Sequence, residues 1–200
     1  MIVLFMICAL GIGLLYGMSG IELTFLNFIS NHSNIILYIL MFSVGISIGM
    51  QKGIFSKIKE YHIKIFIIPL GIIAGSFLGG IICSLILKIP IGYGTAITSG
   101  MGWYSLAGVT ISSLVSAEFG SIAFMSNLMR EMFSFILIPF LAGHFNYYTC
   151  IAPAGATSED TTLPIILKYT NEETVVLSVF NGVICSLMVP FLISSCLNMM

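Results

Sequence analysis

Charged residues are scarce in this chain of 200 residues: they make up 8% of it, against 58% hydrophobic residues, and the mean hydropathy is +1.10. A soluble domain carries about 25% charged residues, so the composition excludes that class and indicates an integral membrane protein. The net charge of −1 offers no basic surface to nucleic acid.

Motifs for metal binding and for catalysis are also lacking. The five cysteines form no CxxC and do not combine with histidine at metal-ligand spacing, which favours buried thiols without disulfide or metal. The three histidines form no HExxH, and Ser105 belongs to no G-x-S-x-G. We therefore predict no enzyme and no cofactor; an aspartyl catalyst built from Glu131 and Asp160 is the alternative.

The first twenty residues lack the basic region and the cleavage site of a secretion signal, so they predict a retained transmembrane helix. At roughly 20 residues for each crossing, the chain has room for about seven hydrophobic segments in one all-α membrane domain, 1–200. Their ranges are 1–17, 34–50, 63–87, 91–115, 121–141, 149–167 and 174–198. Segments 91–115 and 149–167 are rich in Gly, Ser and Thr, which predicts that these two are interrupted or re-entrant.

Lysines indicate the orientation of the chain, because cytoplasmic loops carry the excess of positive charge. The loop 51–62 and its edge hold four lysines, whereas the loop 18–33 has no Lys or Arg. We therefore expect a cytoplasmic N-terminus and, by counting segments, a C-terminus outside. Within segment 63–87, Gly71, Gly75 and Gly79 share one helix face and predict close helix packing.

Four charged residues fall at membrane depth: Arg130, Glu131, Glu159 and Asp160. A charge at the centre of a spanning helix costs roughly 2.5–3.5 kcal/mol and normally faces the bundle interior or a wet cavity. Glu131 lies near the middle of segment 121–141 and shares a face with Asn127, so we expect both to serve a transport path. Arg130 is offset by about 100°. It is expected to snorkel or to neutralise an acid on a neighbouring helix.

The stretch APAGATSEDTTLP, residues 152–164, predicts a broken helix between Pro153 and Pro164. Its freed amide groups are expected to attract a carboxylate, and Asp160 with the freed carbonyls a cation. Glu159 and Asp160 are neighbours and cannot point the same way, so one of them should face the cavity; capping of a half-helix is the alternative reading. The predicted structural and binding residues of this break are Gly155, Ser158, Thr161 and Pro164.

Segment 91–115 offers a companion break around the only tryptophan, Trp103, with glycines on both sides. Two interrupted segments in one bundle are typical of secondary transporters. An interfacial anchor is the alternative role for Trp103.

Four blocks together resemble the bacterial lysine exporter family, LysO: SGMGWYSLAG (99–108), GSIAFMSNLMREMFSFILIP (120–139), GATSEDTTLPII (155–166) and SVFNGVICSLMVP (178–190). The resemblance implies export of L-lysine and lysine analogues across the cytoplasmic membrane in exchange for protons. It maps the family's two intramembrane acids onto Glu131 and Asp160. The family pattern has Asn-Asp where this chain has Ser126 and Asn127, and His where it has Asn181, which bears on substrate range.

The likeness covers the C-terminal two-thirds of a family member. We therefore expect a split exporter in which a small membrane protein supplies the remaining N-terminal helices, with homo-oligomerisation as the alternative. A carrier or channel for a different solute, and a structural subunit of a membrane complex, remain the rival function classes.

Overall fold

The computed structural model describes residues 2–19 and 64–198 together with positions 24, 35, 42 and 46. Apart from those single positions, the predicted helix 34–50 and the lysine-bearing loop 51–62 lie outside the described residues. The chain divides into two compact units, Met1–Ser43 and Val44–Met200. In the first unit, α1 (Ile2–Ser19) covers the predicted helix 1–17.

The second unit is helical throughout its described part. Its elements are α5 (Lys64–Leu87), α6 (Ile91–Thr98), α7 (Tyr104–Leu114), α8 (Ala117–His144), η1 (Tyr147–Cys150), α9 (Ile151–Ala154), η2 (Gly155–Glu159), α10 (Leu163–Tyr169) and α11 (Glu172–Leu197). Three of them, α5, α8 and α11, are long and apolar enough to cross a membrane. The predicted all-α membrane bundle is therefore confirmed.

Large apolar side chains on the outer faces fit a lipid environment. Phe66 on α5 is 54% exposed and Phe191 on α11 is 69% exposed. In water such a surface would cost about 25 cal/mol for each Å², whereas lipid tails remove that cost. The bundle therefore presents hydrocarbon outside, while its interior combines apolar residues with buried polar ones such as Asn127, Glu131 and Asn181.

Local sequence sets the helix ends. The Oγ of Ser116 accepts a hydrogen bond from the N–H of Phe119 at 3.3 Å and begins α8. The side chain of Asn171 does the same for Thr174 at 2.9 Å and begins α11. Both are residue types that satisfy the free N–H groups of a first helical turn.

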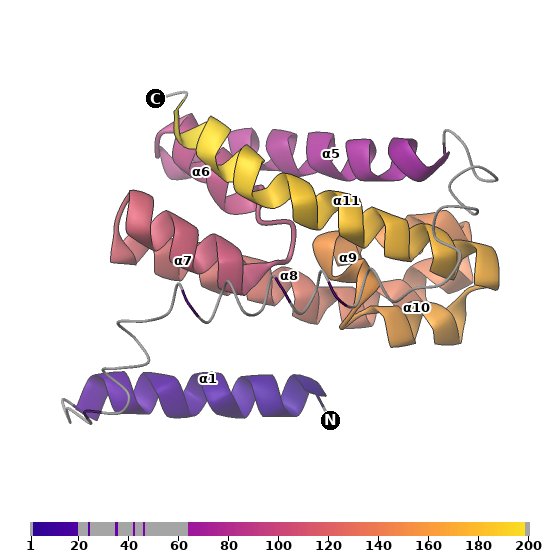
Figure 1. The fold of residues 1–200 in the computed structure, drawn as a ribbon, viewed down its shortest axis with the longest axis horizontal. Coiled ribbons are helices and arrows are strands. Elements are labelled where there is room, and N and C mark those ends of the chain that lie inside the picture. The colour runs from indigo at the N-terminus through magenta and orange to yellow at the C-terminus, as the bar shows by residue number, and fades with distance from the viewer. Residues whose placement is uncertain are drawn as a thin grey trace. The chain divides into compact units, whose positions relative to one another are not determined.

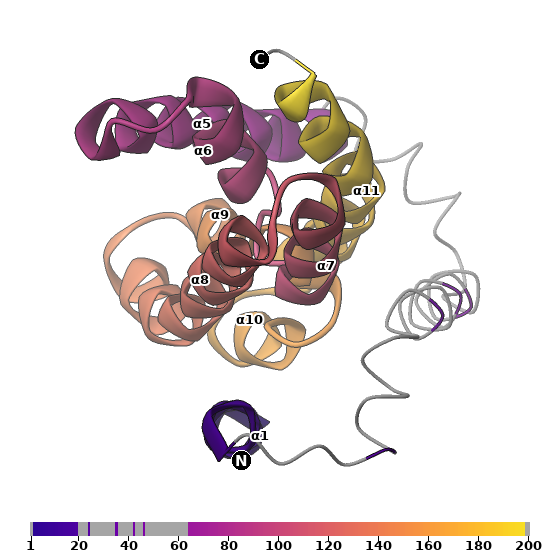
Figure 2. The same cartoon turned by 90° about the vertical axis from the view of Figure 1, so that its left-hand side faces the viewer.

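Helices pack as two antiparallel pairs, α6 against α5 and α7 against α8, and α11 lies against α5, α6 and η2 (Figures 1 and 2). Gly80 and Gly94 make the close contact of the first pair, because a Cβ at either would overlap atoms of the other helix. The predicted glycine face is different. Among the described residues no atom lies within 4 Å of a Cβ added at Gly71, Gly75 or Gly79, so close packing at these three stays a prediction.

Both predicted interruptions are present. Segment 91–115 consists of α6 and α7 with a non-helical link at 99–103, which we name the first break. Segment 149–167 consists of η1, α9, η2 and α10, and residues 155–162 form the second break. Short half-helices thus lie beside three continuous ones.

Candidate functional site

The first break turns on a left-handed backbone. Met101 has φ +48° and Gly102 has φ +100°, values that L side chains rarely adopt. Glycine has no such penalty, which explains Gly102; Met101 is fully buried and is held there by its surroundings. The chain thereby leaves α6 and enters α7 inside the bundle.

The second break starts at Gly155, with φ +58°. The N–H of Ala156 donates to the carbonyl oxygen of Met101 at 2.9 Å, so the two breaks touch each other. A Cβ on Gly155 would overlap that same carbonyl oxygen. Glycine is therefore required both by the backbone conformation and by the contact, and the predicted structural role of Gly155 agrees with this geometry.

Asn127 of α8 clamps the first break. Its Oδ1 accepts from the N–H of Gly102 at 2.9 Å, and its Nδ2 donates to the carbonyl oxygens of Ile97 and Ala123, each at 2.9 Å. The side chain is 2% exposed. All of these contacts are to protein backbone, so Asn127 positions the break.

Asn181 of α11 clamps the second break in a similar way. Its Nδ2 donates to the carbonyl oxygen of Gly155 and to the Oγ of Ser158, both at 2.9 Å. The hydroxyl of Ser158 lies 2.8 Å from the carbonyl oxygens of Gly155 and Ser178. The hydroxyl of Ser178 in turn donates to the carbonyl oxygen of Ser158 at 2.6 Å. Ser158 and Asn181, predicted to bind substrate, are thus engaged in holding the break to α11.

Amide groups of the second break are also engaged, contrary to the expectation that they stand free for a carboxylate. The N–H of Ala156 donates to Met101, and those of Asp160 and Thr162 both donate to the carbonyl oxygen of Thr157 at 3.2 Å. The N–H of Thr161 donates to the side chain of Asp160. These N–H groups are therefore occupied by acceptors within the chain, and a carboxylate ligand needs other donors.

Glu131 of α8 is the exception to this saturation. Its side chain is 0% exposed, and neither carboxylate oxygen has a hydrogen-bond partner in the described part of the chain. The hydroxyl of Thr161 is likewise buried without a partner. The Thr161 hydroxyl lies toward the Glu131 carboxylate without a hydrogen bond of normal geometry, and the Asp160 carboxylate acts on Glu131 electrostatically. A buried polar group without a partner is costly, so this pair of residues is the candidate ligand site of the described chain.

The neighbouring acids Glu159 and Asp160 engage different helices. The Oε1 of Glu159 accepts from the hydroxyl of Ser186 on α11 at 2.9 Å, and Glu159 packs where Gly182 has no side chain. The side chain of Asp160 is exposed and interacts electrostatically with Glu131 on α8 and with Tyr104 at the start of α7. The structure therefore brings Asp160 and Glu131 together and turns Glu159 away.

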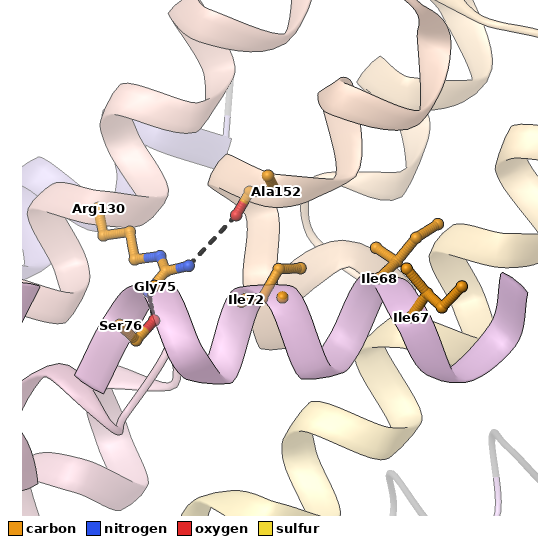
Figure 3. A pocket seen from close by; sticks show the side chains of 8 residues that line it. Ile67, Ile68, Ile72, Gly75, Ser76, Arg130 and Ala152 are labelled. Carbon is orange, nitrogen blue, oxygen red and sulfur yellow. Dashed lines mark hydrogen bonds between the residues drawn. The ribbon is translucent and has the colours of Figure 1, made fainter. Parts of the chain in front are cut away.

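Arg130 points from α8 toward α5 and α9 (Figure 3). Its Nη1 donates to the Oγ of Ser76 at 2.9 Å, its Nη2 to the carbonyl oxygen of Ala152 at 3.2 Å, and its Nε to that of Pro153 at 3.3 Å. The predicted pairing with an acid is not seen among the described residues. The guanidinium instead donates to carbonyl oxygens of α9, just before the chain turns at Gly155 into η2.

A hollow of about 450 Å³ lies beside this guanidinium. Figure 3 shows that Arg130 and Ala152 face α5 across it, and its remaining wall is formed by isoleucines and glycines of α5 together with Ser76. Gly71 and Gly75 leave space in the hollow, because they have no side chain to fill it.

Sequence reasoning missed several residues of this region. From the sequence no contact was predicted for Ser76, Ser178, Ser186 or Tyr104, although the last three lie within the quoted blocks. Trp103 is half-buried directly before α7, and Pro164 occupies the first turn of α10, where its missing N–H costs nothing. Within the described ranges no group of three His, Cys, Asp or Glu side chains gathers to hold a metal ion.

Comparison with known proteins adds an independent line of evidence. Residues 7–197 match the family model described as lysine exporter LysO. The chain is 35% identical over 183 residues to the lysine exporter LysO of Escherichia coli K12, covering 92% of this chain and 60% of that protein. It is 37% identical over 166 residues to a putative lysine exporter of Haemophilus influenzae, covering 82% of this chain and 83% of that protein. The chain thus spans about three-fifths of the length of the Escherichia coli relative. No solved structure matches.

Proposed function

This chain belongs to the lysine exporter LysO family, and we propose that it exports L-lysine and lysine analogues across the bacterial cytoplasmic membrane in exchange for protons. A cationic substrate needs carboxylates, and an antiporter needs groups that exchange a proton for the substrate. Glu131 and Asp160 are the residues assigned to both tasks. The N-terminus is cytoplasmic and the C-terminus lies outside in this proposal.

One observation carries the proposal: the Glu131 carboxylate is fully buried beside the two breaks without a hydrogen-bond donor. A lysine ε-ammonium brings three N–H donors and a positive charge, which is what this carboxylate and the unpartnered hydroxyl of Thr161 lack. Protonation of the carboxylate is the alternative way to relieve the same burial. Substrate and proton therefore compete for one group, which is the requirement for exchange.

Radiolabelled lysine counterflow in proteoliposomes that contain this chain together with the small membrane protein proposed below tests this function. We expect Glu131→Gln and Asp160→Asn each to lower lysine exchange to the level of empty liposomes, because an amide cannot supply the negative charge. Ser113→Ala is the matched control, since its hydroxyl bonds its own helix at Thr110 on an exposed surface, and it should retain exchange. Full exchange by Asp160→Asn would refute the role of that residue, and exchange of another solute by the wild-type chain would move the proposal to that solute.

We further propose that the exporter is split between two chains, with a small membrane protein adding helices to this one. The need for a second chain is measured as resistance to a lysine analogue in a sensitive bacterium that lacks its own exporter. Rescue should require coexpression of the small membrane protein encoded beside this chain. Lysine transport by the purified chain alone in proteoliposomes would overturn the split arrangement and leave a homo-oligomer.

A further inference from the structure

The transported amino acid has a carboxylate as well as an ammonium group, and the second break offers no amide to hold it. Its N–H groups at Ala156, Asp160, Thr161 and Thr162 are engaged within the chain. A different set of donors is therefore needed near the breaks.

We propose that Arg130 and Ser76, at the wall of the 450 Å³ hollow between α5, α8 and α9, form a binding site for the substrate carboxylate. The inference rests on the proposed function and deepens it, because it assigns the end of the amino acid that Glu131 does not bind. The volume of the hollow lies within the range of about 300–1,000 Å³ found for small-molecule sites.

Unused donors support this assignment. A guanidinium has five N–H groups, and the hydrogen bonds to Ser76, Ala152 and Pro153 occupy three of them. Ser76 accepts one of these bonds, and no acceptor for its own O–H is found in the described part of the chain. The hollow is otherwise walled by aliphatic side chains and glycine, without a carboxylate. Free donors and a positive charge in an apolar setting favour a carboxylate, which arginine binds through two parallel hydrogen bonds.

Depth in the membrane distinguishes a substrate carboxylate from a lipid phosphate. Arg130 is the fourteenth of 28 residues of α8, and Ser76 is the thirteenth of 24 residues of α5. The middle of a spanning helix lies about 15 Å from the headgroups, half the thickness of the hydrocarbon core. Headgroup phosphates do not reach this level, whereas a solute crossing the bundle passes it.

Arg130 also connects this hollow to the acidic site. Arg130 and Glu131 are consecutive residues of α8, and their side chains diverge by about 100°. One points to α5 and α9, the other to Asp160 and Thr161. Any movement of α8 during transport displaces the carboxylate site and the ammonium site together.

Binding of lysine and of lysinamide is measured by calorimetry in lipid nanodiscs that hold this chain together with the small membrane protein proposed above, and it tests the site. Lysinamide keeps both amino groups and replaces the carboxylate by a neutral amide. The measured quantity is the ratio of the two dissociation constants. A loss of binding-competent protein affects both constants equally and leaves this ratio unchanged. Three variants are compared: Ser76→Ala, Arg130→Gln and the control Ser84→Ala, whose hydroxyl bonds its own helix at Gly80.

We expect the wild type and Ser84→Ala to bind lysine roughly tenfold more tightly than lysinamide, the effect of a charged hydrogen-bond pair. Ser76→Ala should lower this preference about threefold, and Arg130→Gln should abolish it while lysinamide binds as before. The glutamine amide retains a donor for the carbonyl oxygen of Ala152, which protects the fold.

Equal weakening of both ligands in Arg130→Gln, with Ser76→Ala behaving like Ser84→Ala, would reduce Arg130 to a helix cap and overturn the inference. Equal binding of lysine and lysinamide by the wild type would overturn it and leave the proposed function intact. Absence of lysine binding by the wild type, with the protein folded, would overturn both. A copurified lipid lost only from Arg130→Gln, detected by native mass spectrometry, would assign the hollow to lipid instead.

Discussion

The two breaks share a design and differ in chemistry. Each is held by one buried asparagine from a long helix, Asn127 on α8 for the first and Asn181 on α11 for the second. The first break contains no ionisable side chain near its turn except Tyr104, whereas the second contains Glu159 and Asp160. The first break therefore works as a support, and the second carries the charges.

Hydrogen bonding deepens this contrast. In the described part of the chain, the clamp from α8 on the first break is the side chain of Asn127, which bonds Gly102 and Ile97 across the interface. The clamp on the second is redundant, because Gly155 accepts from both Asn181 and Ser158. A redundant clamp tolerates rearrangement, which suits the segment that we propose to bind and release a substrate.

Replacing the glycine of each break gives the largest expected effect. Gly155→Ala should abolish folded protein, because the new Cβ overlaps the carbonyl oxygen of Met101 and the backbone has φ +58°. Gly102→Ala should cost only about 1–3 kcal/mol, the strain of a positive φ, because the nearest atoms lie at 3.4 Å. Fluorescence-detected size exclusion and thermal unfolding measure both. Comparable stability of the two variants would show that the breaks are not in contact.

Replacing the two clamps gives the next effect. Asn127→Ala should lower the unfolding free energy by about 2–3 kcal/mol, because the buried N–H of Gly102 loses its acceptor. Asn181→Ala should lower it by about 1 kcal/mol, because Ser158 still donates to Gly155. Unfolding in denaturant, followed by the single tryptophan beside the first break, measures this. A larger loss for Asn181→Ala would reverse the assignment of rigid and adaptable breaks.

Composition was enough to predict both breaks. Glycine and hydroxyl residues within apolar runs at 91–115 and 149–167 identified them, and helix periodicity placed Glu131 beside Asn127. Spacing did not predict which glycine of α5 contacts α6. Gly71, Gly75 and Gly79 lie on one face and Gly80 on another, and only the position of α6 decides that Gly80 makes the contact. A regular spacing shows that a face exists, and the tertiary fold decides whether it is used.

Partners of charged residues were equally beyond the sequence. Arg130 bonds Ser76, 54 positions earlier, and the carbonyl oxygens of Ala152 and Pro153. The sequence does not show which backbone carbonyl groups are free to accept a hydrogen bond. For an arginine at membrane depth it therefore predicted an acidic side chain as the partner. For the same reason the sequence did not predict that the N–H groups of the second break are occupied, because they bond to carbonyl oxygens three or five residues away or in the other break, and to the side chain of Asp160.

Adjacent threonines of the second break give the smallest and most selective effect. Thr161→Val removes a buried hydroxyl without a partner, so the unfolding free energy should stay within about 0.5 kcal/mol of the wild type. If that hydroxyl binds the substrate ammonium with Glu131, lysine affinity should fall roughly fivefold, the value of one hydrogen bond. Calorimetric lysine binding and denaturant unfolding measure the two quantities on the same preparation.

Thr162→Val is the matched control, because its hydroxyl donates to the carbonyl oxygen of Thr157 at 2.9 Å and the side chain is fully buried. It should lose about 1–2 kcal/mol of stability and keep the lysine affinity of the wild type. The opposite result, with Thr161→Val destabilised and binding unchanged, would place Thr161 among the supports of the break. The unpartnered oxygens of Glu131 would then have to be satisfied by protonation alone, because no second group in the described chain shares their lack of a partner.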